Sequence, residues 1–230
     1  MSAGCFVTGT DTGVGKTVCA AALIHALAAR GLDVMPMKPI ASGAVVFDGT
    51  WANEDTIALL RAAGRDASRL GDVNPVLLRE PIAPHIAAAR EGRRITLDPV
   101  MAAFARLRAA AQYVVVEGVG GFAVPLADGL DTVDLARALG LPVVLVVGLR
   151  LGCLNHALLT VRAIEASGLR LAGWIANTID PDMAAADENV AALDARVPAP
   201  RLGRVPFLER PAAADAARHL DVSGLLESRA

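Results

Sequence analysis

The sequence predicts an α/β protein: a doubly wound, mostly parallel β-sheet with helices on both faces and a P-loop after its first strand. Strand-like and helix-like runs alternate along the 230 residues, which is the pattern of βαβ units. The strand-like runs are apolar on both faces, as expected for a parallel sheet that helices cover. A glycine-rich turn ending in Gly-Lys-Thr joins the first strand to the first helix. We expect one P-loop α/β domain spanning residues 1–230.

The predicted strands are short and rich in Val, Leu and Ile, and the run Tyr-Val-Val-Val-Glu is the most strand-like because β-branched residues dominate it. They cover residues 5–7, 34–40, 113–117, 142–147, 171–177 and 201–205. Helical patterns lie between them. These cover residues 18–29, 53–63, 84–91, 99–111, 132–139, 154–167 and 183–195.

Residues 5–17 have the composition of a phosphate-binding P-loop. Glycines allow backbone N–H groups to approach phosphate oxygens, and the helix N-terminus adds partial positive charge at the same place. Lys16 would reach the β- and γ-phosphates, and the Thr17 hydroxyl would ligate Mg²⁺. The usual pattern places glycine at position 10, where this chain has Thr10, and Gly9 lies one residue too early. The alternative is a strand-to-helix turn that binds nothing.

Composition and charge exclude several classes of function. Hydrophobic residues make up 54% of the chain and aromatic residues only 3%, which predicts an aliphatic core. The net charge is −2 and there is no basic run, so we expect no nucleic-acid partner. The longest apolar runs are too short to span a bilayer, and we expect no membrane partner. Three scattered cysteines and the lack of a signal-peptide pattern predict a cytoplasmic protein.

Polar side chains follow several predicted strands at the edge where ligands bind in such folds. Lys38 would stabilise charge on a transferred phosphate, or it is simply an exposed lysine. Glu117 would complete a Mg²⁺ site with Thr17, or it forms a salt bridge at a strand end. Asn177 would bind a nucleobase, or it satisfies backbone groups. Asp55 is equally compatible with a metal ligand and with an ordinary acidic residue in the first turn of a helix.

The chain resembles the dethiobiotin synthetases, a family related to P-loop NTPases. The resemblance spans nearly the whole chain and consists of ordered motifs. These are Phe-Val-Thr-Gly-Thr-Asp-Thr-x-Val-Gly-Lys-Thr at 6–17, Lys-Pro-x-Ala-Ser-Gly at 38–43, Val-Asn-Pro at 73–75, Glu-Pro-x-x-Pro-His at 80–85, Val-Glu-Gly-x-Gly-Gly at 116–121, Leu-Gly-Cys-x-Asn-His at 151–156, Ala-Gly-Trp-x-Ala-Asn at 172–177 and Pro-Ala-Pro at 198–200. One departure is Gly13, where some members carry glutamate, so any role of that side chain would fall to backbone or water.

The resemblance implies an ATP-dependent ligase of biotin biosynthesis. Its reaction converts 7,8-diaminononanoate, CO₂ and ATP into dethiobiotin, ADP and phosphate. A carbamate forms on one amine, ATP phosphorylates it, and the second amine closes the ring. The family is homodimeric, and part of the substrate site comes from the partner subunit.

The resemblance also implies a role for individual residues. Lys38, Lys16 and Thr12 would be catalytic, and Thr17, Asp55 and Glu117 would hold Mg²⁺. The nucleotide would contact Gly13, Val14, Gly15, Lys16, Thr17, Val18, Asp55, Glu117, Gly118, Val119, Gly120, Asn177, Val205, Pro206 and Phe207. The diamine would contact Ser42 and the partner's copies of Gly152, Cys153, Leu154 and Asn155.

Two rival functions share the predicted fold. A ParA/MinD-like ATPase switch has a hallmark lysine five residues before the Gly-Lys-Thr lysine, where this chain has Asp11, and residues 213–221 do not form a basic amphipathic helix. A cobyrinate amidase-like ligase usually carries an added glutaminase domain, for which no length remains. ATP turnover that requires the diamine would exclude the switch, and glutamine dependence would indicate the amidase-like ligase.

Overall fold

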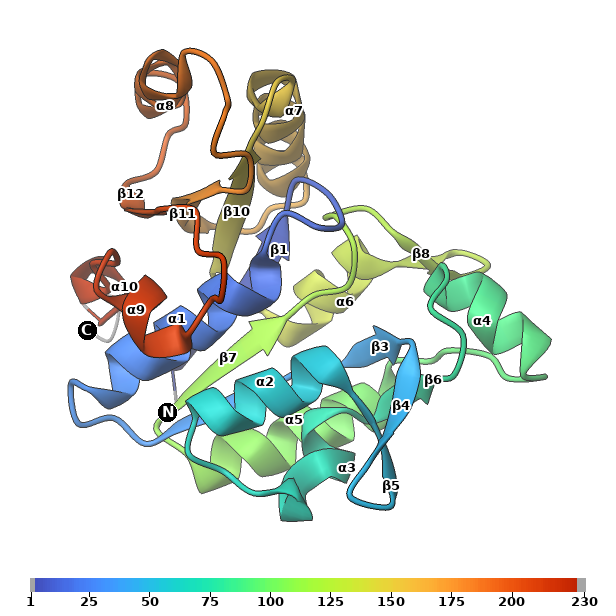
Figure 1. Cartoon of the computed structure of the whole chain (residues 1–230). Helices are drawn as coiled ribbons and strands as arrows, with labels where there is room; N and C mark the ends of the chain where they lie inside the picture. Colours follow the sequence, from blue (N-terminus) through green and yellow to red (C-terminus); the bar gives the residue numbers. More distant parts are fainter. Residues whose placement is uncertain (1–2, 227–230) are drawn as a thin grey trace.

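The computed structural model describes residues 3–226 and contains a central six-stranded sheet (Figure 1). Its strand order is β12-β11-β10-β1-β7-β2, and all five neighbouring pairs are parallel. The strands are β1 (Ala3–Gly9), β2 (Val34–Met37), β7 (Tyr113–Glu117), β10 (Val143–Leu149), β11 (Leu171–Thr178) and β12 (Arg201–Val205). The doubly wound α/β prediction is therefore confirmed, and β1 lies inside the sheet with the P-loop at its carboxyl end.

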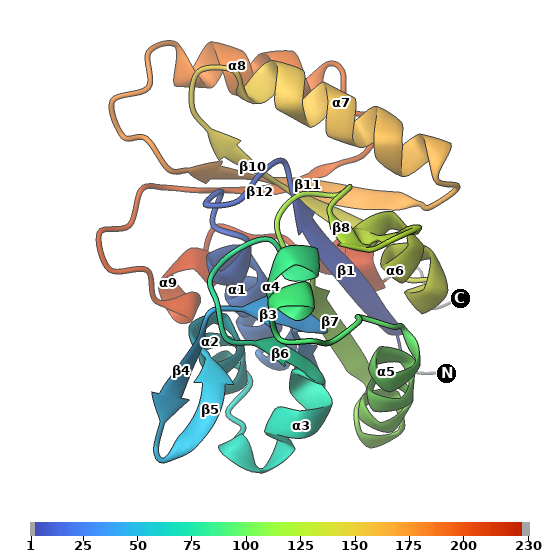
Figure 2. The same cartoon turned by 90° about the vertical axis from the view of Figure 1, so that its right-hand side faces the viewer.

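Helices cover both faces of this sheet, and each face has its own apolar core. One face carries α1 (Lys16–Ala28), with α2 (Glu54–Ala62), α9 (Ala213–Ala217) and α10 (Ser223–Leu226) packed near it. The other carries α5 (Asp98–Ala110), α6 (Thr132–Leu139), α7 (Cys153–Ala166) and α8 (Ala186–Asp194). Figure 2 shows α7 and α8 side by side over β10, β11 and β12. Both faces of each strand are thus covered, which explains the continuous apolar runs.

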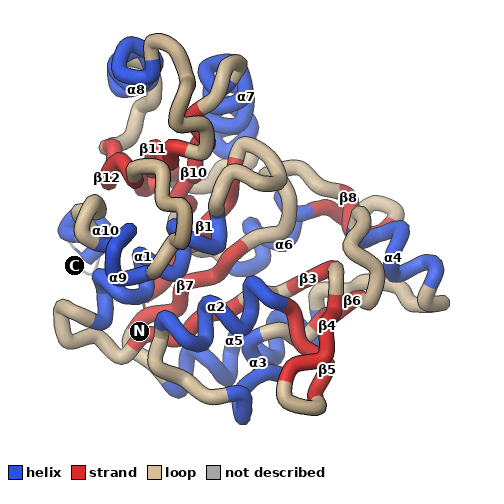
Figure 3. The backbone as a smooth tube through the Cα atoms, viewed as in Figure 1, coloured by secondary structure: helices blue, strands red, loops and turns tan. Residues whose placement is uncertain are grey.

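The segment between β2 and β7 forms smaller structures beside the sheet (Figure 3). β3 (Ile40–Ser42) pairs in parallel with β6 (Val76–Leu78), and β4 (Ala44–Phe47) forms a hairpin with β5 (Thr50–Asn53). The same segment contains the 3₁₀-helix η1 (Ala67–Arg69), α3 (Leu70–Val73) and α4 (Pro84–Arg90). After β7, the short strands β8 (Pro125–Ala127) and β9 (Leu130–Asp131) form a further antiparallel pair. The strands of these smaller structures are two to four residues long, which is too short for a recognisable periodicity, and the sequence did not predict them.

Two predicted elements have different limits in the structure. The strand predicted over 34–40 ends at Met37, and the chain enters β3 at Ile40 after Lys38-Pro39. Pro39 has no N–H to donate, and the N–H of Lys38 bonds to Val73 O instead of to β7. The helix predicted over 183–195 begins only at Ala186, because Ala185 is in the left-handed conformation with φ 54°.

The described helices include none that is both long and apolar enough to cross a bilayer.

Candidate active site at the carboxyl edge of the sheet

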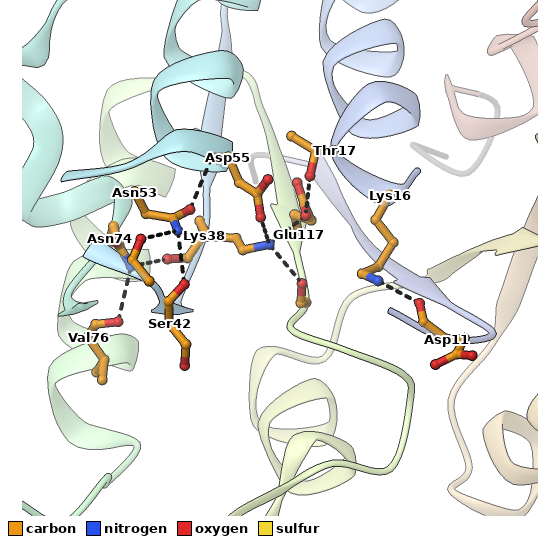
Figure 4. A network of polar contacts seen from close by, with 12 residues as sticks. Asp11, Lys16, Thr17, Lys38, Ser42, Asn53, Asp55, Asn74, Val76 and Glu117 are labelled. Atoms are coloured by element: carbon orange, nitrogen blue, oxygen red, sulfur yellow. Dashed lines mark hydrogen bonds and ion pairs between the residues drawn. The ribbon is translucent and has the colours of Figure 1, made fainter. Parts of the chain in front are cut away.

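A cavity of about 820 Å³ lies at the carboxyl ends of β1, β2 and β7. The P-loop and the start of α1 form one wall, and Val119, Gly120 and Val124 from the segment after β7 form another. Ser42 and Asp55 line it from the smaller structures beside the sheet. The structure therefore brings together residues of motifs that lie far apart in the sequence (Figure 4).

The P-loop has the backbone conformation that its glycines predict. Gly13 and Gly15 have φ 77° and 81°, a region that side chains disfavour, and Gly15 is the N-cap of α1. A Cβ on Gly15 would lie 2.1 Å from Asn177 Nδ2, so the site tolerates only glycine there. Asn177 Nδ2 donates to Val14 O at 2.9 Å, which gives this asparagine a backbone partner. The amide thus fastens the P-loop to the end of β11.

Lys16 is buried at the start of α1, with 7% of its surface exposed. Its ammonium donates to Asp11 O at 2.9 Å, across the P-loop. Burial lowers the pKa of Lys16 and the nearby Lys38 lowers it further, and the carboxylates of Glu117, Asp55 and Asp11 only partly offset this. The positive charge of Lys16 is therefore held at a cost to the folded protein.

This lowered pKa predicts a pH-dependent affinity for phosphate. Only the protonated amine attracts an anion, so affinity should fall as pH rises through a value below 10.5. In Lys16→Arg the fall should move to higher pH, because a guanidinium stays protonated. Titration of the nucleotide-free protein with pyrophosphate between pH 7 and 11 measures both curves. Superimposable curves for the two proteins would contradict the assignment to Lys16.

Lys38 lies between the two carboxylates that the sequence singled out. Lys38 Nζ is 2.9 Å from Asp55 Oδ2 and 2.5 Å from Glu117 Oε1, and it also donates to Gly118 O at 3.3 Å. Figure 4 shows Lys38 and Asp55 pointing toward one another. Burial alone would lower the pKa of Lys38, but the two carboxylates outweigh it and the pKa is raised. Lys38 is thus a stable cation on the cavity wall.

The opposite effect acts on Asp55. Burial raises the pKa of this carboxyl, but Lys38, a hydrogen bond with Thr17 and the charge of Lys16 together lower it. Asp55 is therefore ionised at neutral pH and belongs to one charged group with Lys38 and Glu117.

Lys38 is buried although it lies at the end of a strand. It is only 4% exposed, and its partner Glu117 is completely buried. The physical reason is that the ammonium satisfies two carboxylates, which allows a charge to remain away from water. The interpretation of Lys38 as an exposed lysine is wrong.

The oxygen atoms around Lys38 suit a hard divalent cation. Thr17 Oγ1 donates to Glu117 Oε1 at 2.9 Å, and the buried Glu117 Oε2 has no hydrogen-bond partner. One hydroxyl and two carboxylates, one of which has an oxygen without a hydrogen-bond partner, form a donor set that Mg²⁺ accepts when phosphates and waters complete it. Among residues 3–226 no group of three or more His, Cys, Asp or Glu side chains could hold a metal. The oxygens of a bound ligand would therefore be needed to complete the coordination of a metal ion at this site.

The other residues that were predicted to contact the nucleotide lie around the P-loop. Thr12, Gly13, Val18, Val119 and Gly120 line the cavity. Gly118 lies against the Phe6 ring, where a Cβ would come within 2.9 Å of Cζ. A second cavity of about 190 Å³ adjoins the P-loop on the far side of Asn177. Its lining includes Gly15, Val18, Asn177, Val205, Pro206 and Phe207.

The predicted substrate residues of α7 lie apart from this cavity within the chain. Gly152 is in the left-handed conformation and caps α7, and Cys153 is buried beneath it. Leu151, at the same turn, is 95% exposed. Arg150 just before it pairs with Asp11 at 2.6 Å, which ties this turn to the P-loop.

Three polar residues with contacts at the site were not predicted from the sequence. Arg150 is one, because its partner lies 139 residues away. Asn74 Nδ2 donates to Lys38 O at 2.8 Å and to Val76 O at 3.2 Å. Asn53 caps α2 and also donates to two carbonyls before β4. Asn-Glu-Asp before an apolar run is a signal of a helix start, but it does not indicate the second contact.

Comparison with known proteins agrees with this geometry. The sequence profile of the AAA domain family matches residues 3–214. The chain is 56% identical over 219 residues to the ATP-dependent dethiobiotin synthetase BioD of Aromatoleum aromaticum, covering 95% of this chain and 97% of that protein. The chain belongs to the dethiobiotin synthetase family. The BioD of Ralstonia nicotianae is 55% identical over 96% of each chain.

Solved structures that share the fold are much less similar to this dethiobiotin synthetase family member in sequence. MinD from Aquifex aeolicus matches with a TM-score of 0.55 and 17% identity, over 96% of this chain and 88% of that one. The signal recognition particle receptor FtsY from Elizabethkingia anophelis, solved with GDP, matches with a TM-score of 0.56 and 15% identity. That match covers 99% of this chain but only 63% of FtsY. At such identities the likeness concerns the fold alone, so the MinD-like alternative is a structural relation.

Proposed function

We propose that this protein is a dethiobiotin synthetase, an ATP-dependent ligase of biotin biosynthesis. It converts 7,8-diaminononanoate, CO₂ and ATP into dethiobiotin, ADP and phosphate. The observation that carries this proposal is the identity of 56% over 95% of the chain with a synthetase of that name. The cavity adds support, because it has a P-loop at one end and a buried lysine on its wall. We propose that residues 1–230 work as a single domain.

The proposed reaction has three steps, which balance without a further reactant. The lone pair of one amine attacks CO₂, and the nitrogen loses a proton to give a carbamate. A carbamate oxygen attacks the γ-phosphorus of ATP, the bond to ADP breaks, and a mixed anhydride forms. The second amine attacks the carbonyl carbon and its nitrogen loses a proton, phosphate leaves with the bonding pair, and the five-membered ring closes.

In this proposal the two lysines stabilise negative charge at different places. Lys16 binds the β- and γ-phosphates after it leaves Asp11 O, its partner in the structure. Lys38 faces the carbamate and stabilises the charge on the transferring phosphoryl group. Its carboxylate partners hold the ammonium in place before substrate arrives, so little reorganisation is needed during the reaction. Thr12, in the P-loop, lines the cavity near Gly120.

Thr17, Asp55 and Glu117 would hold the Mg²⁺ that accompanies ATP. When bound, this ion neutralises charge on the phosphates. The unpartnered Glu117 Oε2 and the donor set described above support the assignment. The adenine would occupy the smaller cavity, against Asn177 and the segment Val205, Pro206 and Phe207.

Asp55 lies in the first turn of α2, a position that favours an acid even without a metal. We expect a structure with Mg²⁺ and an ATP analogue to place the Asp55 carboxylate on the ion directly or through one water. A carboxylate beyond both distances would remove Asp55 from the metal site.

We also propose a cytoplasmic homodimer whose substrate site bridges two chains. The three described cysteines are buried and free, which suits a reducing compartment. The N–H of Cys153 donates to Arg150 O at 3.0 Å, and the next N–H groups in the first turn of α7 would suit the carboxylate of the substrate. Leu151 and Leu159 expose 95% and 55% of their surface at this helix, which supports contact with a second chain. Gly152, Cys153, Leu154 and Asn155 would then serve the site of the partner.

Mixing two inactive variants tests the shared site. Lys16→Ala removes the phosphate contact, and Asn155→Trp adds bulk at the exposed start of α7. In a shared site, each heterodimer regains one intact site, so an equal mixture should recover about a quarter of wild-type turnover. Each variant alone is the control. Demonstrated subunit exchange without recovered activity would contradict the shared site.

The activity itself is tested with purified protein, ATP, Mg²⁺, bicarbonate and 7,8-diaminononanoate. We expect dethiobiotin by mass and ATP hydrolysis that depends on the diamine. ATP hydrolysis that is no faster with diamine and bicarbonate than without them, and no ring product, would contradict the proposed function and favour an ATPase switch.

A further inference from the structure

Asn53, the last residue of β5, uses both ends of its side-chain amide. Asn53 Oδ1 accepts from the N–H of Asp55 at 3.1 Å, which caps α2. Asn53 Nδ2 donates to Ser42 O at 3.1 Å and to Gly43 O at 3.2 Å. Figure 4 shows Asn53 between Asp55 and Ser42. A single buried side chain thus joins the end of β3 to the start of α2.

The two segments that Asn53 joins both line the large cavity. Ser42 lines it, and its buried Oγ has no hydrogen-bond partner, so the hydroxyl is available to a ligand. Asp55 lines it as well and holds the Lys38 ammonium at 2.9 Å. The distance between Ser42 and Asp55, the partner of Lys38, therefore depends on what connects β3 to α2.

Backbone pairing lies on both sides of this connection, with β3 paired to β6 and the β4–β5 hairpin beginning at Ala44. The chain bends sharply at Gly43, where φ is 86°, and the bend separates β3 from β4. β3 has only three residues, each paired with β6. The amide of Asn53 holds the two carbonyls at this bend, and the hairpin register places Asn53 opposite Ala44. Loss of the donor would leave two polar groups of the bend without this partner.

We propose that Asn53 is a positioning residue that sets the spacing between Ser42, which contacts the diamine, and the Lys38–Asp55 pair. The inference rests on the proposed function and on the contact of Ser42 with the diamine that the family resemblance implies. The two ends of the Asn53 amide have different effects, which can be measured separately. The cap holds Asp55 and supports the helix, whereas the donor holds Ser42 and governs binding of the diamine.

Three variants separate these consequences. Asn53→Ser keeps a capping hydroxyl, but its side chain is too short to cap α2 and hold both carbonyls. Asn53→Ala removes the cap and the donor. Asp66→Ala removes an exposed cap of η1, which accepts from Ser68 N at 2.9 Å, and is the control for capping alone. Calorimetric titration of the nucleotide-free protein with 7,8-diaminononanoate gives the Kd of the diamine, and titration with an ATP analogue gives that of the nucleotide.

We expect the Kd of the diamine to rise about tenfold in both Asn53 variants, which corresponds to the loss of one or two hydrogen bonds. The Kd of the ATP analogue should stay within about twofold in Asn53→Ser, because the P-loop is untouched. Asn53→Ala and Asp66→Ala should each lower the unfolding midpoint by about 2–4 °C, and Asp66→Ala should change neither Kd. An unchanged diamine Kd, or equal weakening of diamine and nucleotide, would overturn the proposal.

A double-mutant cycle tests whether Asn53 acts through Ser42. Ser42→Ala should weaken diamine binding in the wild-type background but add little in Asn53→Ser, because the hydroxyl is already displaced. Additive effects would overturn the proposal. Wild-type protein that forms no dethiobiotin would instead refute the proposed function, so the two failures are distinguishable.

Discussion

Replacing Lys38 with methionine should abolish most product formation and also destabilise the fold. Turnover should fall by about 10²–10³, the typical loss for one preorganised electrostatic group. Glu117 is fully buried and would lose the ammonium that lies 2.5 Å from its Oε1. Removing one partner of a buried ion pair costs about 3–5 kcal/mol. The raised pKa of Lys38 also indicates that its charge stabilises the folded protein, because folding favours the protonated form.

The double variant Lys38→Met/Glu117→Gln separates the two losses. It removes the uncompensated charge, so thermal unfolding should return toward the wild-type midpoint while product formation stays low. Lys38→Met with wild-type stability would contradict the structural part of this prediction. Retained product formation in Lys38→Met would remove Lys38 from the mechanism.

Replacing Lys16 with alanine should reduce turnover by a similar factor, about 10²–10³, without a comparable loss of stability. Lys16 is also buried, but within residues 3–226 its ammonium hydrogen-bonds to a carbonyl, Asp11 O, and to no carboxylate. Its pKa is lowered, mainly by burial, so the folded state disfavours the charged form. That cost is present below the folded pKa of Lys16 and disappears when the amine deprotonates. Removing the charge at neutral pH should therefore remove this unfavourable contribution to the free energy of unfolding.

Thermal unfolding and product assays on both lysine variants at one pH measure this contrast. We expect the midpoint of Lys16→Ala to match or exceed that of the wild type, whereas Lys38→Met unfolds at a lower temperature. Lys16→Met, which retains most of the buried apolar volume, is the control for packing. A Lys16→Met protein as unstable as Lys38→Met would contradict the assignment of an unfavourable charge.

Local sequence determined the main sheet and the P-loop. Every predicted strand of the sheet was found, because buried parallel strands such as 113–117 are continuous β-branched runs that need no knowledge of their neighbours. The left-handed conformations of Gly13 and Gly15 follow from residue type in the same way. Placement of Lys38 and Glu117 at strand ends also followed, since parallel strands deliver their carboxyl ends to one edge.

Only the tertiary structure decided which of these side chains contact one another. Lys38 meets Asp55 and Glu117, which lie 17 and 79 residues away, and this contact makes a buried charge stable. The donor end of Asn53 binds Ser42 O 11 residues earlier, through a hairpin too short to be recognised. Burial, pKa and hydrogen-bond partners depend on which strands are neighbours. Sequence periodicity carries no record of that order, because it reports only which face of each element is apolar.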